Sequence, residues 1–311
     1  MPVQPNKETL FLHNAEMGLG AWSWGDRTMW NYGHGYTDGD IEAGFRASLD
    51  AGINLVDTAE VYGSGRSERL LGQFLKTTQT PVLVATKFMP YPWLLGRKAL
   101  SDALHRSLER LGLDRVDLYQ IHWPFPPVPI EVWAEELAKV VKAGLTRTVG
   151  VSNYDKNQMQ RTYTVLTRYD IPLASNQVEY HLLDRSVEKN GLLDRCKEFG
   201  IRLISYSPIA KGFLTGKYTP QDPPSGIRAN GAVAKLKRIQ PLIDLMKEIG
   251  KGHAVKTPSQ VALNWIICKG GLPIPGAKTA RQAIENAGAI GWRLTSDEIK
   301  ALDEASDKVT R

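Results

Sequence analysis

The sequence predicts an α/β fold, a (β/α)8 TIM barrel, on two observations. Short apolar runs typical of buried strands alternate with amphipathic helical stripes along the whole chain, and these runs number eight. No Ser/Gly linker, charge block or low-complexity segment interrupts the alternation. We therefore expect one continuous domain over residues 1–311, because this length is enough for one large barrel core.

The expected strands are short, apolar and bounded by turn residues. They lie at residues 16–22, 53–56, 82–86, 116–121, 147–151, 174–178, 202–206 and 272–275. The run at 53–56, for example, begins after Gly52 and ends at Asp57. Such an uninterrupted apolar run is typical of a fully buried strand.

The segments between these runs show helical periodicity. In the first of them, Ile41, Phe45 and Leu49 recur at positions i, i+4 and i+8. Asp40 precedes this stripe as a capping residue, and Gly52 follows it. The later stripes lie near residues 67–76, 100–111, 133–141, 156–169, 187–199, 235–250, 257–269, 279–288 and 295–306.

Composition indicates an ordinary globular protein. Thirty-nine Lys and Arg residues against 33 Asp and Glu give a net charge of +6, which is spread along the chain. This balance is typical of a surface with some attraction for anionic cofactors and argues against a nucleic-acid partner. Cys196 and Cys268 each lie in an apolar helical stripe and are expected to be reduced thiols, which favours a cytoplasmic location.

A signal peptide, a membrane span and a metal site are not expected. The amino-terminal residues contain no apolar core of a signal peptide, and no run approaches the ~18–20 apolar residues of a membrane span. The six histidines include no i, i+4 pair and no cysteine partner, so we expect no metal ligands.

Chemically useful side chains stand at the ends of four expected strands. Asp57 ends the second run and Tyr62 comes five residues later, while Lys87, His122 and the pair at 152–153 end the next three runs. Loops at the carboxyl ends of parallel strands build the active sites of such barrels, so we expect these groups to share one cavity. Taken singly, each has an ordinary structural explanation, such as a capping aspartate, a snorkelling lysine or a buried imidazole. Their succession at neighbouring strand ends favours the functional interpretation.

Six short motifs resemble those of the aldo-keto reductases and occur in the same order. They are Gly18-Leu-Gly-Ala-Trp22, Asp57-Thr-Ala-Glu-Val-Tyr62-Gly, Ala85-Thr-Lys87, Gln120-Ile-His122-Trp, Gly150-Val-Ser-Asn153 and Ser205-Tyr-Ser-Pro208. The resemblance runs from about residue 14 to about residue 306. It is strongest to the branch that includes bacterial and plant reductases and potassium-channel β-subunits. It implies a barrel with extra helices outside it, here those near 235–250 and 295–306.

The resemblance implies a catalytic tetrad of Asp57, Tyr62, Lys87 and His122. Carbonyl reduction needs a proton donor at the carbonyl oxygen, and the phenol of Tyr62, with an ordinary pKa of about 10, is protonated at neutral pH. A Lys87 ammonium beside it would favour the phenolate and so make the phenol a better acid. Asp57 would hold the ammonium, and His122 would orient the substrate oxygen through a hydrogen bond.

The resemblance also implies a nicotinamide dinucleotide cofactor that lies across the strand ends. No Gly-x-Gly-x-x-Gly motif opens a βα unit, so a Rossmann-type site is not expected. The implied cofactor-binding residues are Trp22, Asp57, Ser152, Asn153, Gln177, Tyr206, Ser207, Pro208, Ile209, Ala210, Lys217, Arg228, Gly276, Lys278, Gln282, Glu285 and Asn286.

Parts of this set have distinct expected roles. Ser152, Asn153 and Gln177 would hydrogen-bond the carboxamide, and Tyr206 would stack on the nicotinamide ring. At the other end, cationic side chains would pair with a 2′-phosphate: Lys278 or Arg281, together with Arg228. This pairing favours NADPH over NADH.

Aromatic residues in the loops predict the substrate contacts. They are Trp24, Trp30 and Tyr32 after the first strand, Tyr91 and Trp93 after the third, and Trp123 and Phe125 after the fourth. Aromatic walls favour an apolar or aromatic aldehyde or ketone as the small-molecule partner. Each ring has an equally ordinary alternative role, which is to pack a loop onto the barrel.

The preferred prediction is an NADPH-dependent oxidoreductase that reduces aldehydes or ketones to alcohols, with Tyr62 as the general acid. The alternative is a cofactor-binding, redox-sensing regulatory subunit that acts on a protein partner. The sequence lacks the long amino-terminal extension expected of a channel-inactivating segment, which favours the enzyme. We expect a monomer or a weak homo-oligomer.

Overall fold

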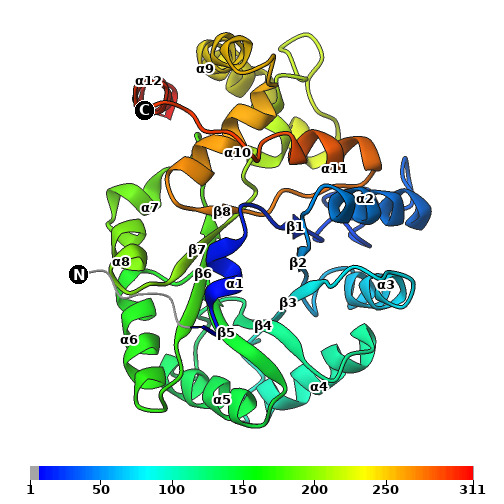
Figure 1. Cartoon of the computed structure of the whole chain (residues 1–311), viewed down its shortest axis with the longest axis vertical. Helices are drawn as coiled ribbons and strands as arrows, with labels where there is room; N and C mark the ends of the chain where they lie inside the picture. Colours follow the sequence, from blue (N-terminus) through cyan, green and yellow to red (C-terminus); the bar gives the residue numbers. More distant parts are fainter. Residues whose placement is uncertain (1–6, 311) are drawn as a thin grey trace.

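Eight parallel strands curl around a common centre inside a shell of helices (Figure 1). The structure is a computed structural model that describes residues 7–310. The strands are β1 (Leu19–Gly20), β2 (Leu55–Asp57), β3 (Leu83–Phe88), β4 (Val116–Ile121), β5 (Thr146–Ser152), β6 (Leu173–Glu179), β7 (Arg202–Tyr206) and β8 (Leu272–Pro273). Strands that follow each other in the chain are neighbours in the sheet. The predicted (β/α)8 barrel is therefore confirmed.

The ring closes between β1 and the segment that follows β8. The backbone N–H of Gly20 donates to the carbonyl oxygen of Pro275 at 3.0 Å, and Gly20 forms a parallel bridge with Gly276. A Cβ atom at Gly20 would lie 2.7 Å from the carbonyl oxygen of Ile274. Only glycine fits this approach, so the first predicted motif contains a residue that the closure of the barrel requires.

Helices surround the strands. They are α1 (Leu10–Asn14), α2 (Asp38–Asp50), α3 (Arg66–Leu75), α4 (Ala99–Leu111), α5 (Ile130–Lys142), α6 (Lys156–Thr167), α7 (Ser186–Lys189), α8 (Leu192–Glu198), α9 (Ala232–Gly252), α10 (Pro258–Cys268), α11 (Ala280–Ala287) and α12 (Ser296–Thr310). Two short 3-10 helices, η1 (Ala210–Thr215) and η2 (Gly226–Ala229), lie between β7 and α9. As expected for extra helices, α9 and α12 pack against each other outside the ring (Figure 1).

Three expected elements differ from the structure. The strand expected at 16–22 is only the two residues Leu19–Gly20 long. The single helix expected at 187–199 is divided into α7 and α8, because Gly191 has a left-handed φ of +75° between them. The strand expected at 272–275 is only two residues long, since Pro273 and Pro275 have no N–H to donate to a neighbouring strand.

Helix α1 has no counterpart among the helices that the sequence predicts. Its residue Leu12 is fully buried against Leu55, Leu118 and other apolar side chains inside the barrel. The carbonyl oxygen of Ala15, just after α1, accepts a hydrogen bond from Arg202, the first residue of β7. Helix α1 therefore closes the amino-terminal end of the barrel and leaves the carboxyl ends of the strands free to form a site.

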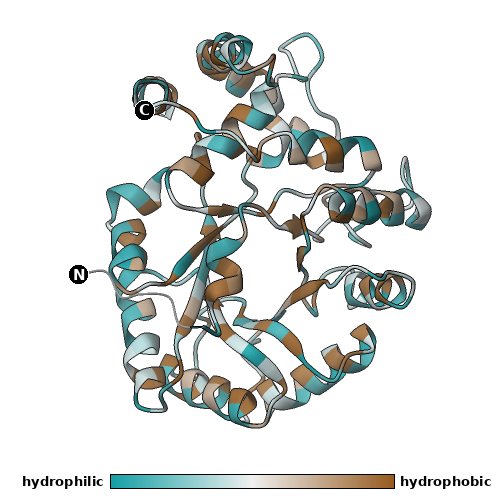
Figure 2. Ribbon diagram, in the orientation of Figure 1, coloured by the Kyte–Doolittle hydropathy of each residue, from teal (hydrophilic) through white to brown (hydrophobic). Residues whose placement is uncertain are grey.

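Hydropathy varies within these elements. The strands carry apolar and polar residues together, and the surrounding helices show both along their turns (Figure 2). Within residues 7–310, none of the helices combines the length and the apolar character that crossing a membrane requires. In the same part of the chain, no three His, Cys, Asp or Glu side chains are grouped so that they could hold a metal ion.

Candidate active site

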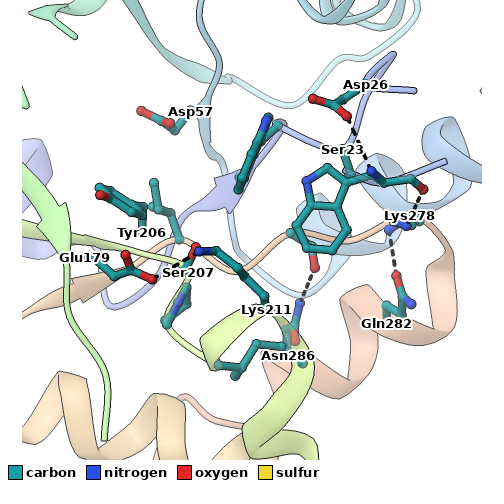
Figure 3. A pocket seen from close by; sticks show the side chains of 18 of the residues that line it. Ser23, Asp26, Asp57, Glu179, Tyr206, Ser207, Lys211, Lys278, Gln282 and Asn286 are labelled. Carbon is teal, nitrogen blue, oxygen red and sulfur yellow. Dashed lines mark hydrogen bonds and ion pairs between the residues drawn. The ribbon is translucent and has the colours of Figure 1, made fainter. Parts of the chain in front are cut away.

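A cavity of about 810 Å³ lies at the carboxyl ends of the strands, where barrel enzymes carry their active sites. Side chains of β2, β6 and β7, the loops that follow several strands and helix α11 form its wall (Figure 3). All of the residues predicted to bind the cofactor lie on this wall except Ala210, which is buried behind it. Of the predicted tetrad, Asp57, Tyr62 and His122 line the cavity, and Lys87 is fully buried beside them.

The buried ammonium of Lys87, near the end of β3, lies at the centre of a polar cluster. Its Nζ donates to Asp57 Oδ1 at 2.5 Å, to the carbonyl oxygen of Thr58 at 2.8 Å and to the hydroxyl of Tyr62 at 3.3 Å. Three acceptors thus satisfy the three N–H groups, as a buried charge requires. The structure brings together the side chains of residues 57, 62 and 87, which the sequence placed on different loops and strands.

The pKa values in this cluster reflect burial and charge together. Burial by itself lowers the pKa of Lys87, but Asp57 and Tyr62 more than offset this effect and the net pKa is raised. Burial raises the pKa of Tyr62, and the positive charge of Lys87 counteracts only part of that increase. Both groups are therefore protonated at neutral pH, so Tyr62 holds a proton that it can give away.

His122, which follows β4, is a neutral and almost fully buried imidazole. Burial, with the charge of Lys87 in second place, lowers the pKa of His122 to about 3. Its ring centroid lies 5.7 Å from that of Tyr62. Within the part of the chain that the structure describes, its buried Nδ1 has no hydrogen-bond partner. Because Nδ1 is enclosed by protein and His122 lines the cavity, the other ring nitrogen, Nε2, is the one available to a ligand there.

The groups predicted to hold a carboxamide form one network at the ends of β5, β6 and β7. Asn153 donates through Nδ2 to the carbonyl oxygen of His122 at 3.0 Å and accepts from the hydroxyl of Tyr206 at 2.9 Å. Ser152 Oγ donates to the carbonyl oxygen of Gln177 at 2.9 Å. Asn153 has a φ of +62°, a left-handed conformation that asparagine tolerates better than most residues.

The loop after β7, which contains the predicted cofactor-binding residues Ser207 to Ala210, has an unusual backbone. Positive φ angles occur at Ser207 (+50°), Ala210 (+50°), Lys211 (+56°) and Gly212 (+98°). Such angles are uncommon outside glycine, and left-handed residues next to right-handed ones form concave nests of backbone N–H groups that bind anions. Backbone strain of this kind gathers at functional sites. The backbone of the loop is therefore suited to phosphate oxygens.

Cationic side chains gather on the part of the wall near α11. They are Lys217, Arg228, Lys278 and Arg281. Lys278 Nζ donates to the carbonyl oxygen of Trp30 at 3.0 Å. Burial, followed by the charges of Arg228 and Lys217, lowers the pKa of Lys278 to about 8. Crowded like charges are relieved by an anion, so this part of the cavity is suited to a phosphate group.

Two side chains of α11 help to shape this end. Gln282 Oε1 accepts from the backbone N–H of Lys278 at 2.8 Å, and Asn286 Nδ2 donates to the carbonyl oxygen of Gly276 at 3.3 Å (Figure 3). These contacts hold the junction between β8 and α11, which carries the predicted cofactor-binding residues Gly276 and Lys278.

Two of the four tryptophans predicted to contact substrate line the cavity, namely Trp30 and Trp123. The prediction for Trp24 is wrong, because this side chain is fully buried in the core. Its indole N–H donates to the carbonyl oxygen of Ala277 at 3.2 Å, and its ring packs edge-on against Phe74.

The prediction for Trp93 is also wrong. The residue is 71% exposed, does not line the cavity, and stacks on Tyr91 with 4.6 Å between ring centroids. The alternative role, packing a loop onto the barrel, does not describe Trp93 either, because its ring is exposed and contacts Tyr91 of the same loop.

Several cavity residues were missed from the sequence. Asp26, Glu179 and Lys211 line the wall, and Lys211 Nζ lies 3.6 Å from Glu179 Oε1. Gln120 lies behind the wall and donates to Asp57 Oδ2 at 3.3 Å. One signal was present for Gln120: it precedes His122 by two residues, and side chains two apart in a strand share one face.

Comparisons with known proteins agree with this geometry. The model of the Aldo/keto reductase family matches residues 16–307. The chain is 42% identical over 303 residues to the chloroplastic pyridoxal reductase of Arabidopsis thaliana, and this match covers 93% of the chain and 82% of the relative.

Two solved structures are similar over nearly their whole length. The glycerol dehydrogenase from Gluconobacter oxydans has a TM-score of 0.83 at 29% identity, covering 95% of this chain and 93% of the other. An aldo/keto reductase from Klebsiella pneumoniae, solved in complex with NADP and acetate, has a TM-score of 0.74 at 28% identity. This match covers 93% of this chain and 90% of the other.

Proposed function

The chain belongs to the aldo/keto reductase family, and from this premise we propose that it reduces an aldehyde or ketone to an alcohol with NADPH as the hydride donor. The observation that carries the proposal is the contact of the Tyr62 hydroxyl with Lys87 Nζ at 3.3 Å, beside a neutral His122 at the cavity wall. A protonated phenol, a fixed cation and a free imidazole nitrogen are what a carbonyl oxygen needs when it gains an electron pair and a proton.

The residues of the cavity fit NADPH at each part of the molecule. Amide and hydroxyl groups of Ser152 and Asn153 suit the carboxamide, and the left-handed backbone near Lys211 suits the pyrophosphate. The cationic cluster that includes Arg228 and Lys278 suits a 2′-phosphate. The solved relative from Klebsiella pneumoniae that binds NADP supports the same choice. NADPH, when bound, supplies the hydride for the carbonyl carbon.

The chain's own residues then handle the proton. Tyr62 donates its hydroxyl proton to the carbonyl oxygen, and the Lys87 ammonium at 3.3 Å stabilises the phenolate that remains. Asp57, 2.5 Å from Lys87 Nζ, keeps that ammonium in place. The neutral ring of His122 carries one N–H, which donates to the same carbonyl oxygen and orients it.

The substrate we propose is a planar, apolar or aromatic carbonyl compound. The indole rings of Trp22, Trp30 and Trp123 line the cavity, and flat rings of this kind stack on planar ligands. The relative named pyridoxal reductase is 42% identical to this chain, which supports including pyridoxal, an aromatic aldehyde, among the compounds tested.

The test follows NADPH absorbance with aromatic and aliphatic aldehydes, including pyridoxal, for the wild type, Tyr62→Phe and Tyr163→Phe. Tyr163 stacks on Phe199, does not line the cavity and serves as the matched control. Fluorescence first establishes that all three proteins bind NADPH. We expect Tyr62→Phe to lose about 10²–10⁴-fold in kcat, the usual contribution of a general acid, while the control keeps wild-type activity.

A different outcome would overturn the proposal. If the wild type binds NADPH but turns over no carbonyl, the protein is not acting as a reductase, and a search for a protein partner replaces the substrate screen. If Tyr62→Phe retains full activity, the proton comes from another group.

A further inference from the structure

Gln120, on β4, is a buried amide that the predicted tetrad does not include. It is 0% exposed and does not line the cavity. Its Nε2 donates to Asp57 Oδ2 at 3.3 Å, and its Oε1 accepts from Ser175 Oγ at 3.3 Å. Burying a polar side chain is unfavourable unless its groups are paired, so both ends of this amide are held in place.

The sheet makes room for this amide. Strand pairing sets Gln120 beside Lys87 on β3 and beside Gly150 on β5, and Gly150 is in turn beside Ser175 on β6. A Cβ atom at Gly150 would lie 2.2 Å from Ser175 Oγ and 3.2 Å from Gln120 Cγ. A glycine therefore stands where any larger residue would displace Ser175 and Gln120.

The side chains of Asp57, Gln120 and Gln177 come from alternate strands and meet inside the barrel. Asp57 is on β2, Gln120 is on β4 and Gln177 is on β6, in the way that alternate strands supply each layer inside a (β/α)8 barrel. Asp57 Oδ1 accepts from Lys87, while Oδ2 accepts from Gln177 at 2.8 Å and from Gln120. One carboxylate oxygen thus faces the reacting groups, and the other is held by two amides.

The two glutamines differ in what else they can contact. Gln177 lines the cavity and is proposed to bind the carboxamide of the cofactor, whereas Gln120 does not reach the cavity. We propose that Gln120 is a positioning residue for the reaction: it fixes the Asp57 carboxylate in the orientation in which Asp57 holds Lys87 beside Tyr62. This inference rests on the proposed function.

The physical consequence concerns the acidity of Tyr62. The negative charge of Asp57 raises the pKa of Tyr62, and Lys87 lowers it. A donor on Oδ2 disperses the charge of the carboxylate and prevents it from rotating away from Lys87. Without that donor, Asp57 should oppose ionisation of Tyr62 more strongly and Lys87 should be less well held, so proton donation should slow.

The first experiment compares kcat and KM of the wild type, Gln120→Leu and Thr148→Val. Thr148 is a matched control, because it is 2% exposed on the neighbouring strand and bonds the carbonyl oxygen of Asp117 instead of Asp57. We expect Gln120→Leu to lose about tenfold or more in kcat, as for a lost hydrogen bond to a charged group. Its KM for the carbonyl and Kd for NADPH should stay at wild-type values, since Gln120 does not line the cavity.

A second variant gives a signature that a purely structural role would not produce. In Gln120→Glu the new carboxyl group, while protonated, can donate an O–H to Asp57, but once ionised it places a second negative charge beside it. We therefore expect the kcat of Gln120→Glu, relative to wild type, to recover as the pH is lowered, whereas that of Gln120→Leu stays reduced. A pH-independent ratio for Gln120→Glu would overturn the inference.

A double-mutant cycle tests the contact without any turnover. Urea unfolding is measured for Gln120→Leu, Asp57→Asn and the double variant, and a parallel cycle uses Thr148→Val. Non-additivity in the first cycle but not in the second supports the coupling between Gln120 and Asp57. This result holds even if no carbonyl is reduced and the proposed function fails. Additivity in both cycles would overturn the positioning role of Gln120. The same holds if the wild type is active and Gln120→Leu has the same kcat.

Discussion

The buried charge of Lys87 requires hydrogen-bond acceptors around it. Asp57, the Thr58 carbonyl oxygen and Tyr62 supply its three acceptors. Removing one partner of a buried ion pair costs about 3–5 kcal/mol, because the other charge is left unpaired. Substitutions at Asp57 or Lys87 therefore change stability and chemistry together. Tyr62→Phe keeps the ion pair, so it is the cleaner probe of catalysis.

His122 should make stability depend on pH. Its pKa is about 3 in the folded protein, below the ordinary value of 6.5. Between these values the unfolded chain binds a proton that the folded protein excludes, so stability falls as the pH drops from about 6.5 towards 3. Between pH 7 and pH 5, the free energy of unfolding of the wild type should fall by about 2 kcal/mol more than that of His122→Gln.

Urea unfolding at the two pH values measures this difference. The control is His105→Gln, which changes an exposed histidine on α4. Equal pH dependence in the wild type and His122→Gln would contradict the burial of a neutral imidazole at this position.

Among the elements, α1 should contribute to stability and not to catalysis. Leu12 is fully buried inside the amino-terminal end of the barrel, away from the strand ends that form the cavity. Leu12→Ala should lower the free energy of unfolding by about 2–5 kcal/mol, the usual range for a buried leucine, and leave kcat and KM unchanged.

Leu10→Ala is the control for this prediction, since Leu10 lies on the same helix but is 43% exposed. Chemical denaturation and steady-state kinetics at a temperature where both variants are folded give the comparison. Loss of activity in folded Leu12→Ala would mean that the two ends of the barrel are coupled.

The cationic cluster near α11, which includes Lys278, should make NADPH binding sensitive to pH. Lys278 is mostly charged below its pKa of about 8 and mostly neutral above it. The ordinary pKa of lysine is 10.5, and the lowering to about 8 brings the loss of this charge into a pH range where binding can be measured. The Kd for NADPH should therefore rise several-fold as the pH increases from 7 to 9, because a phosphate binds the charged form more tightly.

NADH has no 2′-phosphate and provides the internal control. Fluorescence titrations should give a Kd for NADH that changes much less over this range, and Lys278→Met should remove the extra pH dependence of NADPH. The same pH dependence for both cofactors would place the 2′-phosphate away from Lys278.

At the scale of the whole molecule, the barrel should unfold in one transition. Each strand is hydrogen-bonded to the next, and the contact of Gly20 with Pro275 joins the two ends of the sheet. Far-ultraviolet circular dichroism and tryptophan fluorescence should report the same midpoint. NADPH at about 100 times its Kd should shift the entire transition by about 2.7 kcal/mol. Two separate midpoints, of which NADPH moves only one, would contradict the single-domain prediction.

The individual residues show why some positions could be predicted from the sequence and others could not. Asp57, Lys87 and His122 were identified because each ends an apolar run, and the carboxyl ends of parallel strands must lie at one end of a barrel. Gln120 was missed although it shares a strand face with His122, because its partners on β2 and β6 are distant in sequence. Trp24 was misplaced because an aromatic side chain suits a core as well as a cavity wall.

The sequence by itself determined the order of strands and helices, the family, and which strand ends bring polar side chains to one cavity. These depend on periodicity and on short motifs, which are local properties of the chain. The tertiary structure alone decided which loop side chains face the cavity, how α1 closes the barrel and how Gly20 joins its ends. It also decided which amides hold Asp57. Such contacts join residues far apart in the chain, and their geometry exists only once the strands are packed.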